Sequence, residues 1–260
     1  LHRTYALLGS YKAAIKICHE IFPFCQPTDQ NCTEHKLAVY NSLRDYYGKT
    51  GEYDSALESA KQGLSLVEHD FGKTSEMYAT YLYNVVSVYQ DLYDCDTALV
   101  LTKKLIQVYE KNQMSNPDLF LSIQAGLAES YSCLDSLDKS FEIKLKVLKG
   151  RAEMAGKENE DYIRAEFNLA AAYFNSGYFN KAFDLLLECS QRAKRVMRPY
   201  EDLYLRIKML AADVGGKKGF YDLSKRFYHE AMDTAKVYYG ENSLIYDNIE
   251  HTFASTLHDM

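Results

Sequence analysis

The sequence lacks the features of several large functional classes. It has no excess of basic charge, because 36 acidic residues outnumber 30 lysines and arginines and the formal net charge is −6. Nucleic acids and anionic membrane surfaces are bound through basic faces, so this balance argues against both and leaves open only a local basic patch. No apolar run approaches the roughly 18 residues of a membrane span, and no signal peptide opens the chain. We therefore expect no nucleic-acid binding and no direct membrane binding by this segment.

Motifs of catalysis are missing as well. The sequence has no HExxH motif, no dinucleotide-binding fingerprint and no motif typical of a Ser-His-Asp or Cys-His catalytic site. The run from Gly215 to Gly219 resembles a phosphate-binding loop, but such a loop needs Ser or Thr after its lysine and a strand before it. His251 and His258 share one helix face without a third ligand nearby, which is more typical of a polar face than of a metal site. We expect no enzymatic activity, no metal and no cofactor.

The six cysteines include no CxxC pair, so metal-binding and redox motifs are not indicated. Cys95 and Cys189 fall in predicted helices and are interpreted as small core residues. Cys25 and Cys32 bracket a predicted loop that a disulfide could close in an oxidising compartment, and a reduced pair fits equally well. Asn31-Cys32-Thr33 is a glycosylation sequon, which matters only in a secreted eukaryotic chain.

A fixed interval of 42 residues runs through the chain. Tyrosine makes up only 23 of 260 residues, yet it occupies five successive positions at this interval, which chance does not explain. Fixed periods of this length are typical of stacked supersecondary units. The five positions are Tyr5, Tyr47, Tyr89, Tyr131 and Tyr173.

The interval carries a pattern that predicts two helices and a turn. It is plainest in Leu43-x3-Tyr47-x3-Gly51-x-Tyr53-x2-Ala56 and recurs from Leu169 to Ala182. Leu and Tyr four residues apart lie on one helix face, and the glycine ends that helix. The small residue that follows lets a second helix approach closely. We expect the periodic tyrosines to lie on the buried, packing side of each first helix.

This pattern resembles the tetratricopeptide repeat, in its long-helix variant typified by kinesin light chain, because the unit is 42 rather than about 34 residues long. The resemblance covers essentially the whole chain and implies an all-α fold, a right-handed superhelical solenoid of antiparallel helix pairs. It implies full repeats at 37–78, 79–120, 121–162, 163–204 and 205–246, with partial repeats at 1–36 and 247–260. Neither end shows a polar capping element, so we expect a fragment of a longer solenoid.

In proteins with this repeat, motif positions two, six, nine and thirteen of each first helix face a ligand in a concave groove. These offsets define one helix face. Of the twenty residues that the resemblance places there, only Leu210 is large and apolar. The stripe residues taken as binding candidates are Ser42, Asn84, Ser87, Glu129, Arg164, Asn168, Asn175 and Arg206. The candidates for apolar pockets at the rim are Tyr83 and Phe167.

Asn84 and Asn168 occupy the same motif position, where the resemblance implies that a fixed amide pairs with the C=O and N–H of an extended peptide. Arg164 and Arg206 repeat one position in successive units and are able to hold a carboxylate. For each residue the alternative is a solvated side chain or one that is hydrogen-bonded within the array.

The resemblance implies a non-catalytic module that binds an extended peptide or a partner helix of another protein. The alternative is the ligand-sensing segment of a larger signalling protein, such as a sensor kinase or a transcriptional regulator. In that case the array would switch an attached effector domain in the full-length chain.

Overall fold

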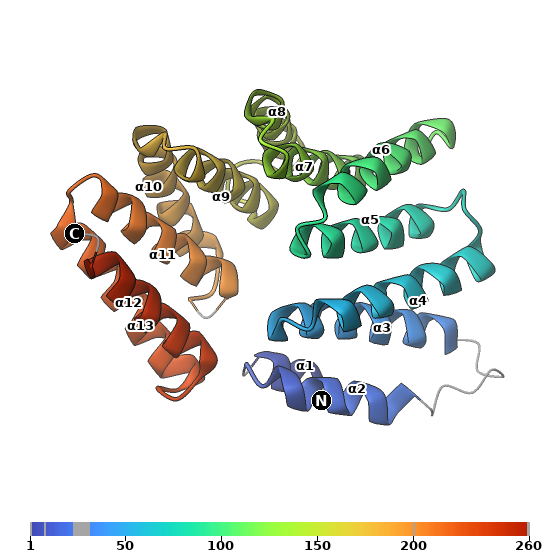
Figure 1. Ribbon diagram of the computed structural model, residues 1–260, viewed down its shortest axis with the longest axis horizontal. Helices are drawn as coiled ribbons and strands as arrows, with labels where there is room; N and C mark the ends of the chain where they lie inside the picture. Colours follow the sequence, from blue (N-terminus) through green and yellow to red (C-terminus); the bar gives the residue numbers. More distant parts are fainter. Residues whose placement is uncertain (1, 8, 23–31, 200, 259–260) are drawn as a thin grey trace. The chain divides into compact units, whose positions relative to one another are not determined.

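The computed structural model describes residues 2–7, 9–22, 32–199 and 201–258. All regular elements in these ranges are α-helices, drawn as coiled ribbons in Figure 1, which confirms the all-α prediction. Their bounds are α1 (His2–Leu7), α2 (Tyr11–Ile21), α3 (Cys32–Thr50), α4 (Tyr53–Phe71), α5 (Glu76–Asp91), α6 (Cys95–Lys111), α7 (Pro117–Cys133), α8 (Leu137–Ala155), α9 (Glu160–Asn175), α10 (Phe179–Val196), α11 (Asp202–Lys217), α12 (Tyr221–Tyr239) and α13 (Leu244–His258). Cys25 and Asn31 lie outside the described residues.

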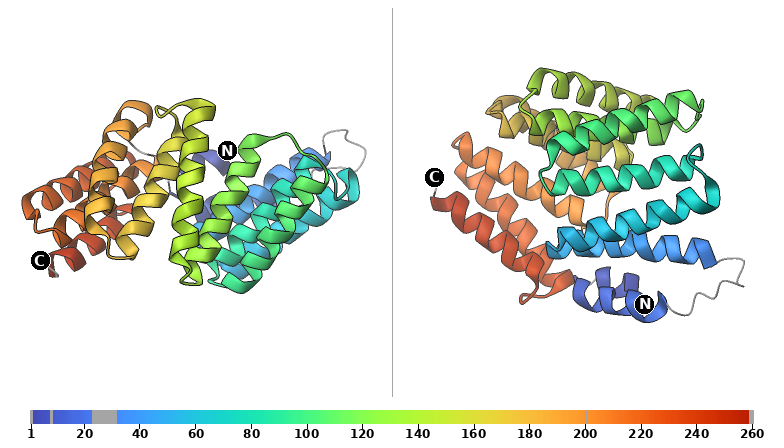
Figure 2. Two further views of the ribbon diagram at one scale, coloured as in Figure 1. Left: turned by 90° about the horizontal axis from the view of Figure 1, so that it is seen from above. Right: turned by 45° about the vertical axis from the view of Figure 1, so that its right-hand side comes forward.

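The chain divides into two compact units, residues 1–140 and 141–260, and each is described by itself. In the first unit each of the helices α1 to α6 packs against the next one, and α3 to α6 lie side by side in Figures 1 and 2. In the second unit α9 packs on α10, α10 on α11 and α11 on α12, while α11 also touches α9 and α13. Each unit therefore has the helix-pair stacking that the sequence predicts.

The first helices begin slightly before the predicted repeat boundaries. Helix α3 begins at Cys32 rather than at 37, and α9 begins at Glu160 rather than at 163. The side chain of Asn159 caps α9 by accepting the backbone N–H of Asp161 at 2.8 Å. The period is therefore a reliable guide to helix spacing, and the capping residues decide where each helix starts.

The turn inside each helix pair repeats one hydrogen bond. The carbonyl of the periodic position accepts the N–H of the residue five later, for example Glu52 to Tyr47 at 2.9 Å and Tyr178 to Tyr173 at 2.8 Å. The residue before that donor has a positive φ, which is the usual C-terminal cap of a helix. These residues are Gly9, Gly51, Tyr93, Asp135, Gly177 and Gly219. The turn keeps the same conformation where Tyr93 or Asp135 stands in place of glycine.

Tyr93→Gly is expected to raise the free energy of unfolding by about 1 kcal/mol, because a left-handed residue other than glycine is strained. Tyr93 has φ 57° and is 83% exposed, so its ring contributes little packing. Asp135→Gly is the matched comparison, and a smaller gain is expected because aspartate tolerates this conformation better. Urea denaturation measures both variants, and a loss of stability in Tyr93→Gly would contradict this account of the turn.

Small residues occupy the predicted contact position of each second helix. Ala14, Ala56, Ala98 and Ala182 are at most 1% exposed, which confirms the prediction. Serine replaces alanine at Ser140 and Ser224, and both serines are fully buried. The Ser140 hydroxyl donates to the carbonyl of Ala128 at 2.8 Å, so its polar group is satisfied. The packing requirement at this position is small volume rather than an apolar side chain.

The prediction that the periodic tyrosines are buried is wrong in degree. Tyr47, Tyr89, Tyr131 and Tyr173 are half-buried, and Tyr5 is 39% exposed. Lysines cover the open faces of several rings: Lys61 lies 5.6 Å from the centroid of Tyr89, and Lys181 lies 5.2 Å from that of Tyr173. Lys139 lies 5.3 Å from the centroid of Tyr131. The rings serve as platforms for cations at the interhelical turns, which the repeat pattern alone does not reveal.

Candidate functional site

In the first unit the polar stripe is hydrogen-bonded to itself. The Asn84 amide on α5 donates to Oδ1 of Asn41 on α3 at 3.1 Å. Arg44 donates to the same Asn41 oxygen at 3.1 Å and to the hydroxyl of Ser87 at 3.2 Å. Ser42 turns its hydroxyl back to the carbonyl of Ala38 at 2.9 Å. Three candidates of this unit, Asn84, Ser87 and Ser42, therefore already have partners within the array.

Acidic residues beside Arg44 are partly desolvated. Arg44 pairs with Asp45 at 2.7 Å, and a cavity of about 270 Å³ is lined by both residues together with Lys49 and Asp91. Burial raises the pKa of Asp45 and of Asp91 above the ordinary aspartate value, and the charges of Arg44 and Lys49 partly offset this effect. This part of the stripe is a charged network in which Arg44 is half-buried while Asp45, Lys49 and Asp91 remain exposed at its rim.

Tyr83 and Glu129 complete the candidates of the first unit. The half-buried Tyr83 ring lies against Gly126 of α7, where a Cβ atom would come within 2.9 Å of the ring. Gly126 replaces the asparagine that the repeat pattern favours, and the tyrosine ring lies where that side chain would begin. Glu129 is half-buried on the same helix. The role of Tyr83 seen in the structure is therefore packing between α5 and α7.

In the second unit several candidates remain without partners. Among the described residues the Asn168 and Asn175 side chains on α9 form no hydrogen bond, and Arg206 on α11 forms no ion pair. Asn175 and Arg206 are exposed and Asn168 is half-buried. Arg164 differs, because it pairs with Glu160 at 2.5 Å on its own helix. Asn84 and Asn168 share one motif position in the sequence, but in the structure only Asn84 has a hydrogen-bond partner.

Phe167 is not an open apolar pocket. Its side chain is 5% exposed and belongs to the core of the second unit. The Arg206 guanidinium lies over its ring at 5.1 Å from the centroid, so the aromatic face orients the cation. Phe167 precedes Asn168 on α9, and α9 contacts α11. An unpaired amide and an unpaired guanidinium thus lie on adjoining first helices.

A part-buried hydrogen-bond network, which the sequence does not predict, links three helices of the second unit. Asp213 Oδ1 on α11 accepts the hydroxyl of Tyr228 on α12 and that of Thr256 on α13, the latter at 2.8 Å. Burial raises the pKa of Asp213, while the two hydroxyl donors work in the opposite direction. Asp213 and Thr256 are 43 residues apart, which is close to the repeat interval. This spacing is the one feature of the sequence that could have indicated their contact on adjoining first helices.

Asp213→Asn is expected to match or exceed the stability of the wild type at pH 7, because it keeps an oxygen acceptor and removes a desolvated charge. Asp213→Ala should cost about 1 to 3 kcal/mol, since it removes the acceptor of the buried Tyr228 hydroxyl and of the half-buried Thr256 hydroxyl. The folded-state pKa of Asp213 lies above 3.8, so its charge destabilises increasingly as pH rises through that pKa. Chemical denaturation should therefore show a larger advantage of Asp213→Asn at pH 7 than at pH 4.

The sequence also does not predict one disulfide and one buried ion pair. Cys95 is buried as predicted, but it forms a disulfide with Cys133, the fourth stripe position of α7. Glu166 is 1% exposed and pairs with Arg192 of α10 at 2.6 Å. Cys189 is fully buried, which confirms the prediction for that residue. The Cys95 and Cys133 spacing of 38 residues does not equal the repeat, so the periodic pattern gave no reason to pair them.

The structure places the Gly215 to Gly219 run at the end of α11 and in the turn before α12, as predicted, and not after a strand. In the described part of the chain no group of three or more His, Cys, Asp or Glu side chains is arranged to hold a metal ion. None of the described helices is long and apolar enough to cross a membrane.

Comparison with known proteins agrees with this architecture. The family model of the tetratricopeptide repeat matches residues 168–197, which cover the second half of α9 and all of α10. A structure of kinesin light chain TPR-like repeats from Podosopora anserina is 17% identical, with a TM-score of 0.55, and the match covers 77% of this chain and 95% of that one. No curated protein matches the sequence. Residues 168–197 therefore match the tetratricopeptide repeat, and the fold of the chain resembles that of kinesin light chain repeats.

Two further solved structures with this fold contain peptides. NprR in complex with its cognate peptide NprX is 13% identical, with a TM-score of 0.68, and the match covers 99% of this chain and 74% of that one. PlcR from Bacillus thuringiensis, in complex with the peptide PapR7 and DNA, is 13% identical, with a TM-score of 0.65 and coverage of 89% and 76%. At these identities the likeness establishes the fold alone.

Proposed function

We propose that the chain is a non-catalytic module that binds an extended peptide along the first-helix face of α9 and α11. The observation that carries this proposal is the contrast between the two units. Asn84 is engaged by Asn41 in the first unit, whereas Asn168 and Arg206 in the second unit have no hydrogen-bond or ion-pair partner among the described residues. Polar groups without partners at one helix face are available to a ligand.

The chemistry of these two groups suits a peptide with an acidic group. The Asn168 amide offers two donors and one acceptor, so it can pair with a backbone C=O and N–H whatever the peptide side chains are. The Arg206 guanidinium, held by the Phe167 ring, offers a planar fork of donors for a carboxylate. Asn175 lies seven residues after Asn168 on the same helix and extends the polar face. The peptides present in the NprR and PlcR structures support this use of the fold.

Selection from a displayed library of random peptides tests the proposal. We expect the wild-type chain to enrich a consensus with an acidic residue, and the Asn168→Ala/Arg206→Ala variant to lose that enrichment. Arg226→Ala is a matched control, because Arg226 is an exposed arginine on the second helix α12. If the wild type and the double variant enrich the same consensus equally, the peptide binds outside this face. If neither enriches a consensus, the chain does not bind peptides in this way.

A regulatory version of this function remains the second candidate. It is favoured by the matched NprR and PlcR chains, which extend beyond the part that this chain covers, and by the DNA in the PlcR structure. In such a protein the peptide would bias an attached effector. Activity of a full-length chain with and without the selected peptide distinguishes a switch from a simple binding module.

A further inference from the structure

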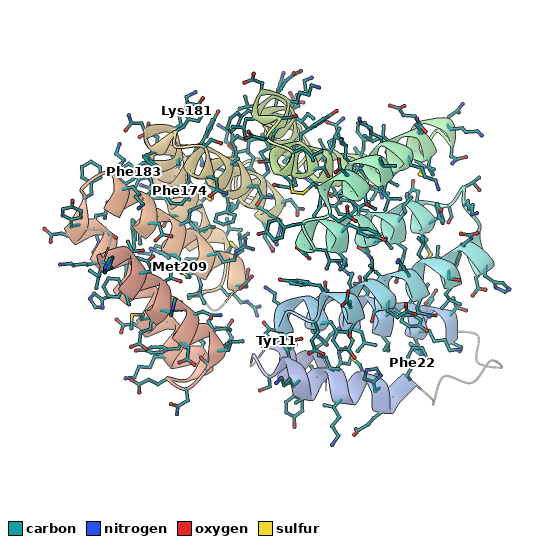
Figure 3. The ribbon with its side chains drawn as sticks, in the orientation of Figure 1. Tyr11, Phe22, Phe174, Lys181, Phe183 and Met209 are labelled. Atoms are coloured by element: carbon teal, nitrogen blue, oxygen red, sulfur yellow. A yellow bond between two sulfur atoms is a disulfide. The ribbon has the colours of Figure 1, made fainter. Side chains whose placement is uncertain are left out.

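A second, separate site is indicated at the turns of the second unit. A cavity of about 540 Å³ lies where the turn between α9 and α10 meets the end of α11. Lys181, Lys217 and Lys218 line it together with Tyr178, Phe179 and Asn180, and no acidic side chain is among its described lining residues. Lys181 and Phe183, both on α10, are labelled in Figure 3. Three ammonium groups around one cavity are notable in a chain of net charge −6.

Aromatic rings, rather than carboxylates, position two of these lysines. The Lys181 ammonium lies 5.2 Å from the ring centroid of Tyr173 and 5.3 Å from that of Tyr178. The Lys218 ammonium lies 5.0 Å from the centroid of Phe183 and donates to Oδ1 of Asn180 at 2.6 Å. Rings orient an ammonium group without neutralising its charge.

Neither of these two lysines forms an ion pair within the described chain. Other lysines of the second unit do so: Lys208 pairs with Glu230 at 2.7 Å and Lys236 pairs with Glu241 at 2.8 Å. Lys181 and Lys218 differ because their only described contacts are rings and one neutral amide. Their positive charge is therefore available to an anion that enters the cavity.

The start of α10 adds donors to the same cavity. Its N-cap residue, Tyr178, makes no side-chain capping bond, and the first turn contains no acidic residue. The first N–H groups of a helix have no partner within that helix, so here they can bond to a ligand. The lysines are the basis of the site, and these N–H groups supplement them.

We propose that this cavity binds a phosphate group, either as a phosphate monoester or as inorganic phosphate. Such a group carries close to two negative charges at neutral pH and presents three strong acceptor oxygens, which matches several ammonium donors better than a single carboxylate does. The site is unlike a P-loop, because its lysines come from the turns of two successive helix pairs. Lys181 and Lys218, on which the site rests, are not residues of the peptide face of α9 and α11. Its ligand is either a phosphorylated side chain or free phosphate.

Calorimetric titration separates the two sources. The ligands are inorganic phosphate, a hexapeptide with one phosphoserine and its unphosphorylated form, each at an ionic strength matched with sodium chloride, because screening alone changes weak binding. We expect saturable binding of at least one phosphorylated ligand and none of the unphosphorylated peptide. Binding of the phosphopeptide alone would identify a modified protein as the source, and binding of both would identify a general phosphate site.

Charge variants make the test specific. Lys181→Gln/Lys218→Gln should weaken phosphate binding by about tenfold or more, and the corresponding Lys→Arg pair should retain most of it. Lys194→Gln/Lys225→Gln removes two exposed lysines of α10 and α12 outside the cavity and should leave binding unchanged. Circular dichroism confirms that each variant is folded, and the single variants Lys181→Gln and Lys218→Gln replace the glutamine pair if that pair is not folded. Absence of binding by both phosphorylated ligands, or equal affinity in the glutamine pair, overturns the proposal.

Discussion

Cys133→Ser is expected to lower the free energy of unfolding by about 4 kcal/mol under non-reducing conditions. The Cys95–Cys133 disulfide spans 38 residues and joins the start of α6 to the end of α7. Closing a loop of this length removes conformational entropy from the unfolded chain, which corresponds to about 4 kcal/mol at 25 °C. Cys133 is exposed, so the substitution itself disturbs little packing.

Urea denaturation of the wild type and of Cys133→Ser, each with and without dithiothreitol, measures this effect. Reduced wild type should coincide with the variant, and the variant should not respond to the reductant. Mass spectrometry of the alkylated protein confirms which state was measured. A wild type whose unfolding midpoint is unchanged by complete reduction would show that the crosslink contributes no stability.

Arg192→Met is expected to cost about 3 to 5 kcal/mol at pH 7, because it leaves a buried carboxylate without its cation. Glu166 is 1% exposed, and the Arg192 side chain that pairs with it is 12% exposed. The second oxygen of Glu166, Oε2, is buried and has no hydrogen-bond partner in the described residues. The arginine is therefore the main compensation for this charge.

The cost should depend on pH in a defined direction. Burial already raises the pKa of Glu166 above 4.5, although Arg192 opposes this, and removing Arg192 raises that pKa further. An acid whose folded-state pKa is raised binds more protons in the folded state, so stability falls as pH rises through that pKa. The deficit of Arg192→Met should therefore shrink as pH is lowered toward 4.5.

Two variants control this prediction. Glu166→Gln/Arg192→Met removes the buried charge along with its partner and should recover most of the lost stability at pH 7. Arg195→Met breaks the solvent-exposed pair of Arg195 with Glu158 and should change stability little. Denaturation curves at pH 5 and pH 7 for all three variants provide the comparison. A deficit of Arg192→Met that does not change with pH would mean that lost packing, not charge, is responsible.

The sequence predicts the helices and turns well because those depend on local, repeated requirements. A left-handed residue is needed at each turn, and the chain adopts it even at Tyr93 and Asp135, where glycine is absent. A small residue is needed where two helices meet, and Ser140 and Ser224 satisfy that need as Ala56 does. These positions follow the 42-residue period, so one repeat predicts the next.

The site is less predictable because it depends on partners outside the motif. Asn84 and Asn168 share a motif position, but only Asn84 has an asparagine, Asn41, on the preceding first helix within hydrogen-bonding distance. The lysine cavity depends on contacts between two turns of successive helix pairs, which no single repeat contains. The periodic pattern indicates which face to inspect, and the neighbouring side chains decide which residues of that face are available.

The most direct test of the account compares one substitution in the two units. A fluorescent peptide obtained by selection is titrated against the wild type, Asn168→Ala and Asn84→Ala, with a thermal melt of each protein. We predict that Asn168→Ala weakens the affinity by about tenfold with an unchanged melt, and that Asn84→Ala leaves the affinity unchanged and lowers the melting temperature slightly. Loss of affinity in Asn84→Ala with full affinity in Asn168→Ala would contradict the placement of the peptide on α9 and α11.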